Sequence, residues 1–282
     1  MLVFEQKSLL TSYLKPFLSN NNTIGFVPTM GALHDGHLAL IKNSTENNDF
    51  SVVSIFVNPT QFNNSQDLEK YPRTLETDIE KIKTICPNCI IFAPSVEEIY
   101  EGKTNSTSFN YDGIENEMEG KHRPGHFDGV GTIVKKLFEI VKPTNAYFGE
   151  KDFQQLQIVK KLVAKNNLKV NIIGCPIFRE SNGLAMSSRN ERLSKEDRND
   201  ASIIYRTLLS AKEKFGTKSA NEVTKWVVNS LKKHKNLTLE YFEIADEETL
   251  KSSLRKSNTK KYRAFIAVFV DNIRLIDNIS LN

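Results

Sequence analysis

The sequence has no hydrophobic run long enough to cross a membrane. Its longest apolar stretches, residues 52–57 and 264–270, are far shorter than the roughly 20 residues that a membrane-spanning helix needs. The N-terminus becomes polar within its first seven residues, which argues against a secretory signal peptide. We therefore expect a cytoplasmic protein that does not bind membranes.

Cysteine is also scarce. The odd third cysteine argues against a disulfide framework, and Cys86 and Cys89 form a lone CxxC pair with no second pair or nearby histidine to complete a zinc site. We expect two thiols in a helix-to-strand turn, with no assigned role. Walker A and HExxH motifs are absent from the sequence, which argues against a P-loop kinase and a zincin.

Charge of one sign is not concentrated anywhere. The 38 Lys and Arg residues exceed the 34 Asp and Glu residues by four, giving a net charge of +4. The basic residues occur in short pairs such as Lys135-Lys136 and Lys232-Lys233, which are typical of solvated helix faces. The composition therefore favours small anionic ligands and predicts no nucleic-acid partner.

What the sequence does contain is a regular alternation of strand and helix patterns. Apolar, strand-like segments occur at 23–27, 50–57, 89–92, 145–148 and 169–173, and helical patterns lie between them at 38–46, 75–85, 129–141 and 153–165. Such alternation predicts an α/β fold with a Rossmann-like, doubly wound parallel sheet covered on both faces. Ligands of these sheets bind at the carboxyl ends of strands, near the topological switch.

The pattern changes after residue 176. A loop over 178–190 precedes a helix that Ser194 can cap, with Glu196 in its first turn. A helical stretch at 220–233 and strand-like segments at 239–245, 263–270 and 272–276 follow, with a hairpin at Asp271-Asn272. We expect 282 residues to form about two domains. These are a larger Rossmann-like domain at 1–176 and a smaller α+β domain at 177–282 that acts as a lid.

The segment 24–37 is the strongest functional signal. An apolar strand breaks at Pro28 into a small-residue loop, and His34 and His37 then open a helix. Free backbone N–H groups and the helix dipole favour an anion there, and imidazoles at i and i+3 lie on one face of the helix. This pattern predicts a nucleotide triphosphate site, although a simple polar helix cap is the alternative.

Two further turns carry residues suited to the same ligand. At the end of another apolar strand, Lys151 could neutralise a phosphate, Asp152 could bind a ribose hydroxyl and Gln155 could reach a second ligand through its amide. The Ser187, Ser188 and Arg189 side chains offer hydroxyls and a guanidinium for phosphate oxygens. The alternatives are a solvated helix cap for the first turn and a serine-rich linker for the second.

The remaining polar motifs are built around prolines. The segment 58–62 offers two amides, those of Asn58 and Gln61, which can bind carboxylates and hydroxyls without charge. Arg123 lies in a proline turn just before His126. His122 and His126 do not fit a helical metal pair, because Pro124 and Gly125 interrupt the helix that this spacing would need.

Taken in order along the chain, the segments ending at His37, Gln61, Gln155 and Arg189, with the Arg123 to Phe127 motif, resemble the pantothenate synthetase (pantoate–β-alanine ligase) family of the nucleotidyltransferase superfamily. The resemblance is strongest over residues 1–190, and it implies that the domain at 1–176 binds the nucleotide and pantoate. It implies a two-step ligation in coenzyme A biosynthesis. ATP and (R)-pantoate give pantoyl adenylate and pyrophosphate, and β-alanine then releases pantothenate and AMP. It also implies Mg²⁺ and a homodimer.

The resemblance assigns His37, His34 and Lys151 to catalysis, with His37 as proton donor. Gln61 and Gln155 are the implied pantoate ligands, and Gln61 also lies near β-alanine. The implied ATP-binding residues are Met30, Gly31, Ala32, Leu33, His34, Asp35, Gly36, His37, Gly149, Glu150, Lys151, Asp152, Phe178, Met186, Ser187, Ser188 and Arg189.

Two positions depart from the family pattern. Asp78 is the implied magnesium contact, but the neighbouring acidic position of some relatives is Thr77 here. Asp128 lies where many relatives carry a basic residue, so its role stays open.

Two other functions share some of these features. A simple nucleotidyltransferase that moves AMP onto a phosphorylated substrate would use the same histidine turn and Ser/Arg segment. The paired Gln61 and Gln155 favour a neutral polyol-carboxylate pocket instead. An RNA-binding module is the third possibility, and the modest net charge and the lack of an aromatic and basic surface run argue against it.

Overall fold

The computed structural model describes residues 1–253 and 255–282. The chain forms two compact units. The first contains residues 1–150 and 155–176, and the second contains residues 151–154 and 177–282. Each unit is described by itself.

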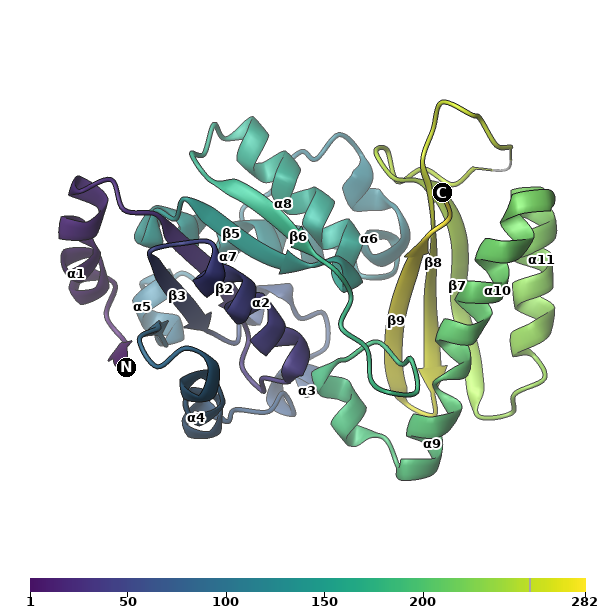
Figure 1. The fold of residues 1–282 in the computed structure, drawn as a ribbon, viewed down its shortest axis with the longest axis horizontal. Coiled ribbons are helices and arrows are strands. Elements are labelled where there is room, and N and C mark those ends of the chain that lie inside the picture. The colour runs from purple at the N-terminus through teal and green to yellow at the C-terminus, as the bar shows by residue number, and fades with distance from the viewer. Residues whose placement is uncertain (254) are drawn as a thin grey trace. The chain divides into compact units, whose positions relative to one another are not determined.

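The first unit is built on a six-stranded sheet of order β1-β4-β3-β2-β5-β6, in which every pair is parallel (Figure 1). Its strands are β1 (Leu2–Phe4), β2 (Ile24–Thr29), β3 (Phe50–Ile55), β4 (Ile90–Phe92), β5 (Asn145–Gly149) and β6 (Asn171–Cys175). From β2 the chain proceeds to one side of the sheet, and from β5 it proceeds to the other. The topological switch therefore lies between β2 and β5, as a doubly wound sheet requires.

Helices connect these strands. They are α1 (Lys7–Ser19), α2 (Asp35–Glu46), α3 (Ser65–Glu69), α4 (Leu75–Ile85), α5 (Val96–Tyr100), α6 (Met118–His122), α7 (His126–Val141) and α8 (Phe153–Lys165). The bounds of α4 and α8 are those that the sequence predicts. In the described part of the chain, no helix combines the length and the apolar character that crossing a membrane would require.

Helices cover both faces of this sheet, as predicted. One core cluster joins the strands to α2 and α4 and includes Val27, Val53, Ile91, Ile41 and Ile82. On the opposite face, the Phe138 ring of α7 lies with its centroid 6.1 Å from that of Phe26 and 6.5 Å from that of Phe148. The Rossmann-like arrangement is therefore confirmed.

The prediction that the first apolar strand breaks at Pro28 is wrong, because β2 continues to Thr29. Proline lacks the N–H group that a central strand donates to its neighbour. Here β2 pairs with β5 only at Gly25 and Phe26, so Pro28 lies beyond the end of that pairing while its register with Ser54 of β3 is kept.

The prediction of two thiols in the turn after α4 is also wrong, because Cys86 and Cys89 form a disulfide. Helix α4 ends at Ile85, and the Cys89 N–H group donates to the Cys86 carbonyl. That turn brings the two Cα atoms within 5.3 Å, inside the range that a disulfide can bridge. Cys175 is a buried free thiol, and burial raises its pKa.

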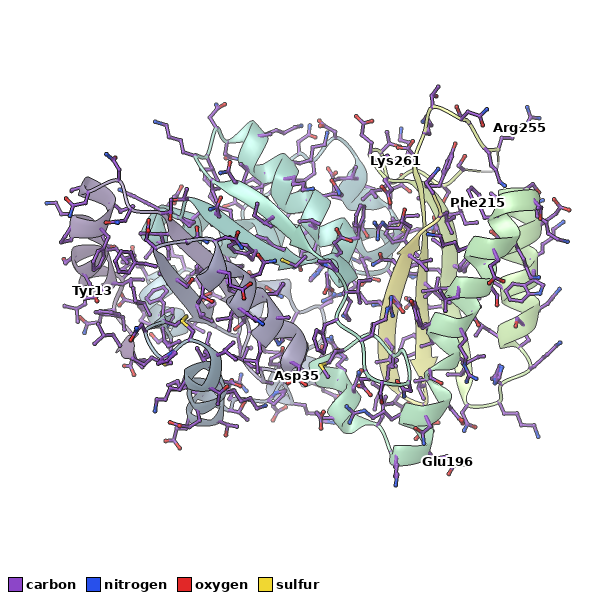
Figure 2. The ribbon with its side chains drawn as sticks, in the orientation of Figure 1. Tyr13, Asp35, Glu196, Phe215, Arg255 and Lys261 are labelled. Atoms are coloured by element: carbon purple, nitrogen blue, oxygen red, sulfur yellow. A yellow bond between two sulfur atoms is a disulfide. The ribbon has the colours of Figure 1, made fainter. Side chains whose placement is uncertain are left out.

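The second unit is an antiparallel sheet of order β7-β8-β9 covered by helices. Its elements are α9 (Lys195–Asp200), α10 (Ile203–Thr217), α11 (Ala220–Leu231), β7 (Leu237–Asp246), β8 (Tyr262–Val270) and β9 (Ile273–Ser280). The Ser194 hydroxyl accepts the Asp197 N–H group, so Ser194 caps α9 as predicted, with Glu196 in the first turn (Figure 2). Asp271, at φ 50°, turns the chain between β8 and β9. The smaller α+β C-terminal part is therefore confirmed.

Candidate active site

The histidine turn lies at the topological switch, where β2 ends beside β5. His34 caps α2, and its backbone N–H group donates to Nδ1 of His37 at 3.3 Å. The two imidazole ring centroids are 4.0 Å apart. Asp35, between them, is exposed in the first turn of α2 (Figure 2). The structure thus brings both imidazoles together at the helix N-terminus, as the sequence predicts.

The prediction of free backbone N–H groups in this turn is wrong for two residues. The Ala32 and Leu33 N–H groups donate to Oδ2 and Oδ1 of Asp78, at 2.9 and 2.7 Å. Asp78 comes from α4, so the protein supplies its own anion to the turn. A bound phosphate would have to meet other donors, and the two imidazoles are the nearest in sequence.

Asp78 does not fit the magnesium contact that the resemblance implies. Its side chain is fully buried, and Oδ2 also accepts the Thr74 hydroxyl at 3.2 Å. Both oxygens therefore face hydrogen-bond donors, whereas a cation needs oxygens that face it. Over residues 1–253 and 255–282, no group of three or more His, Cys, Asp or Glu side chains could hold a metal ion.

Gln61 belongs to a short turn, Pro59–Gln61, that follows β3. Its Nε2 lies 3.1 Å from the Met30 sulfur, so the turn implied for pantoate contacts the turn implied for ATP. Asn58 donates from Nδ2 to Gln61 Oε1 at 3.0 Å and accepts the Tyr100 hydroxyl at 2.6 Å. Asn58 is buried and its amide already makes these hydrogen bonds, so it does not fit the ligand-binding role expected of it, and the role of Gln61 stays a prediction.

Tyr100 keeps Asn58 in this orientation. Burial raises the pKa of the Tyr100 hydroxyl, opposed by its hydrogen bond with Thr60. The hydroxyl therefore stays protonated and can donate to Asn58 throughout the neutral range.

The Gln61 turn is supported from the segment 123–129. The backbone carbonyl oxygen of Gln61 lies 2.8 Å from His126 Nδ1 and accepts a hydrogen bond from Arg123 Nη2 at 3.3 Å. Gly129 of α7 approaches so closely that a Cβ atom there would lie 2.3 Å from the Thr60 carbonyl oxygen. As predicted, His122 and His126 do not share a helix, since α6 ends at His122 and α7 begins at His126.

Asp128 has a structural contact in this region. Its Oδ1 accepts the Phe109 N–H group at 3.0 Å. A basic residue at this position would not make that hydrogen bond.

Lys151 is anchored within the second unit. Its carbonyl oxygen accepts Asn278 Nδ2 at 2.9 Å, and Asn278 Oδ1 accepts Arg263 Nη1 at 2.6 Å. The Arg263 guanidinium also lies 4.0 Å from the centroid of the Phe153 ring. The Lys151 ammonium is 3.6 Å from Asp152 Oδ2. The backbone that carries Lys151 is therefore fixed by side chains of β8 and β9.

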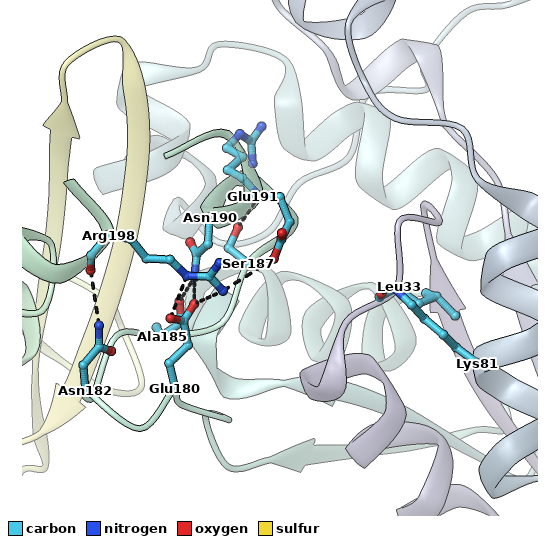
Figure 3. A network of polar contacts seen from close by, with 10 residues as sticks. Leu33, Lys81, Glu180, Asn182, Ala185, Ser187, Asn190, Glu191 and Arg198 are labelled. Carbon is cyan, nitrogen blue, oxygen red and sulfur yellow. Dashed lines mark hydrogen bonds and ion pairs between the residues drawn. The ribbon is translucent and has the colours of Figure 1, made fainter. Parts of the chain in front are cut away.

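The segment 178–190 is a hairpin that an ionic network stabilises (Figure 3). The Phe178 carbonyl accepts the Met186 N–H group at 3.0 Å, and the Phe178 side chain is 42% exposed. Glu180 Oε1 accepts Asn190 Nδ2 at 2.7 Å, and Oε2 accepts Arg198 Nε at 2.8 Å. This network, which no local sequence pattern indicates, positions the residues that lead into Met186 to Arg189.

Ser187 has a local structural role in the segment Met186 to Arg189. The Ser187 hydroxyl accepts the Arg189 N–H group at 3.3 Å, so it caps the short helix Ser188–Arg192.

The residues implied for ATP are divided along the chain between the units. Met30 to His37, Gly149 and Glu150 belong to the first, as do Gln61 and Gln155, and Lys151, Asp152, Phe178 and Met186 to Arg189 belong to the second.

Comparison with known proteins gives a consistent answer. The pantoate-beta-alanine ligase family model matches residues 2–280. The pantothenate synthetase of Flavobacterium psychrophilum is 68% identical over 281 residues, and that of Christiangramia forsetii is 54% identical over 282 residues, each covering 100% of both chains.

Solved structures agree with this result. Pantothenate synthetase from Thermus thermophilus superposes with a TM-score of 0.91 at 38% identity, covering 100% of this chain and 99% of that one. Pantoate-beta-alanine ligase from Francisella tularensis, complexed with beta-gamma ATP and beta-alanine, gives a TM-score of 0.82 at 37% identity, covering 100% and 98%. The chain therefore belongs to the pantoate–β-alanine ligase family, the pantothenate synthetases.

Proposed function

We propose that this enzyme ligates (R)-pantoate to β-alanine in two steps. Cleavage of ATP drives the first step, and cleavage of the adenylate drives the second. In the first, a pantoate carboxylate oxygen attacks the α-phosphorus of ATP, and the bond to pyrophosphate breaks. In the second, the β-alanine amine attacks the acyl carbon of pantoyl adenylate. The new amide forms as the bond to AMP breaks, and the amine loses a proton. The products are pantothenate, AMP and pyrophosphate.

The observation that carries this proposal is the pair of imidazoles at the switch point. With ring centroids 4.0 Å apart, His34 and His37 can donate to oxygens of one phosphate group as negative charge develops. We assign His37 as the proton donor and Lys151 as the cation that offsets the repulsion between the carboxylate and the triphosphate. Neither step requires a serine or cysteine nucleophile, because the adenylate is itself the activated species.

Gln61 and Gln155 are assigned to pantoate, and Gln61 also to β-alanine. Support for Gln61 comes from its contact with Met30, which joins the acid-binding turn to the nucleotide-binding turn. An amide can hydrogen-bond both the carboxylate and the hydroxyls of pantoate without adding charge. A nucleotidyltransferase acting on a phosphorylated acceptor would need cations at these positions instead.

Asp78 is not assigned to Mg²⁺, because its oxygens already accept the Ala32 and Leu33 N–H groups. Mg²⁺ stays in the proposal as an ion that would screen the phosphate charge together with the protein's own donors. The lid action of residues 177–282, the homodimer, the cytoplasmic location and the absence of a nucleic-acid partner stay predictions.

The test is the release of pyrophosphate before β-alanine is added. Purified protein with ATP, (R)-pantoate and Mg²⁺ should release about one equivalent of pyrophosphate per active site, and AMP should appear only after β-alanine is added. Pyrophosphate release that depends on β-alanine would contradict the two-step order. AMP transfer onto a phosphorylated acceptor, with no response to β-alanine, would support the simple nucleotidyltransferase.

A further inference from the structure

The loop between β2 and α2 has an unusual backbone. Gly31 and Ala32 are both left-handed, at φ 82° and 50°. Glycine adopts this conformation readily, but alanine does so at a cost of roughly 1–2 kcal/mol, so surrounding contacts must stabilise it. Successive N–H groups in such turns form a concavity that binds anions.

Asp78 fills that concavity. Its two oxygens accept the N–H groups of Ala32 and Leu33, and Thr74 gives a third hydrogen bond. A fully buried carboxylate is costly unless hydrogen bonds to the charged form compensate it, and these three bonds do so. The contact therefore stabilises both partners, the ionised side chain and the left-handed loop.

Lys81, one turn further along α4, contacts the same loop. Its ammonium donates to the Leu33 carbonyl oxygen at 2.6 Å, as Figure 3 shows. Asp78 and Lys81 are at i and i+3 and therefore lie on the same face of α4. From that face Asp78 accepts the N–H group of Leu33, and Lys81 donates to its C=O group. The next residue is His34, the cap of α2.

We infer that Asp78 and Lys81 are positioning residues that fix the His34/His37 turn for ATP, and that Asp78 is not a magnesium ligand. The inference rests on the proposed role of the two imidazoles in nucleotide binding. It predicts that either side chain acts through loop geometry and not through its charge.

The opposite charges of Asp78 and Lys81 make a decisive pair of variants. Asp78→Asn removes a negative charge, which by itself would favour ATP, whereas Lys81→Met removes a positive charge, which would disfavour it. If loop geometry dominates, both variants should weaken binding of a non-hydrolysable ATP analogue by about 10-fold or more. Calorimetry should show the weakening both with Mg²⁺ and in EDTA.

Opposite shifts in the two variants would overturn the inference in favour of a charge effect. Weaker binding of Asp78→Asn in Mg²⁺ alone, with wild-type affinity in EDTA, would restore Asp78 as a metal ligand. Wild-type affinity of both variants under both conditions would remove the positioning role. Glu76→Gln, an exposed carboxylate in the first turn of α4, is the matched control and should bind as wild type does.

The folding of the two variants is checked by a separate control measurement. Asp78→Asn places an amide N–H₂ group against a backbone N–H group, so its thermal unfolding is measured first. Lys81 is exposed, and Lys81→Met should fold even if Asp78→Asn does not, in which case Lys81→Met decides the outcome alone. Steady-state kinetics should show a raised KM for ATP and an unchanged KM for β-alanine. Wild-type pyrophosphate release, run in parallel, reports separately on the proposed function.

Discussion

His37 and Lys151 are the side chains for which single substitutions should have the largest chemical effect. His37→Ala and Lys151→Ala are expected to lower the rate of adenylate formation by about 10²–10³-fold, the loss typical of one donor to developing negative charge. Pyrophosphate release in a single turnover with pantoate measures this rate.

A matched control for Lys151→Ala is Lys160→Ala, which removes an exposed lysine of α8. It should leave the rate unchanged. Because His37 also accepts the His34 N–H group, circular dichroism must show that α2 persists in His37→Ala. Near-wild-type pyrophosphate release in a folded His37→Ala or Lys151→Ala variant would refute the assigned role.

At the residue scale, the sequence predicted what depends on near neighbours. The His34/His37 pairing follows from helical spacing within one turn. The engagement of Ala32 and Leu33 by Asp78 involves partners 46 and 45 residues apart, and no local pattern indicates which buried carboxylate will meet which amide. The same holds for Asn58, whose partner Tyr100 is 42 residues away.

At the element scale, Gly129 decides how closely α7 can approach the Gln61 turn. Gly129→Ala would place a Cβ atom 2.3 Å from the Thr60 carbonyl oxygen, and backbone atoms must move to relieve that contact. We expect a loss of about 1–3 kcal/mol in the free energy of unfolding, and a KM for pantoate raised by about 10-fold. Denaturant unfolding and steady-state kinetics check the two expectations.

Gly216→Ala is the control, because no neighbouring atom lies within 4 Å of a Cβ atom at that position of α10. It should be neutral or slightly stabilising. An unchanged KM for pantoate in Gly129→Ala would show that the turn tolerates the displacement.

Regular elements were predicted best where their patterns are long. Helices α4 and α8 begin and end where the periodicity predicts, whereas the edge strand β1 has only three residues and gave no signal. Helix α1 carries Pro16 in its interior, which conflicts with the usual helical pattern. The disulfide was missed because a single CxxC pair is compatible with free thiols, with a metal site and with a bridge.

At the scale of the whole molecule, no single position in the sequence separates the two units, because the chain passes from one unit to the other more than once. The change of pattern after residue 176 indicates where the second unit resumes, but residues 151–154 belong to that unit as well. They are fixed there by Asn278, which is 127 residues from Lys151 along the chain. Contacts over such a distance depend on the completed fold, and sequence periodicity does not reveal them.

Asn278 therefore connects the C-terminal sheet to Lys151, the lysine that we propose for catalysis. Asn278→Ala removes the hydrogen bond to the Lys151 carbonyl and leaves the buried Arg263 without one acceptor. We expect kcat to fall by about 10-fold and the free energy of unfolding to fall by about 1–3 kcal/mol. The KM for pantoate should stay unchanged, because Gln61 belongs to the other unit. Asn272→Ala, at the exposed β8–β9 turn, is the control. If Asn278→Ala lost stability but kept its wild-type kcat, Asn278 would stabilise the sheet without positioning Lys151.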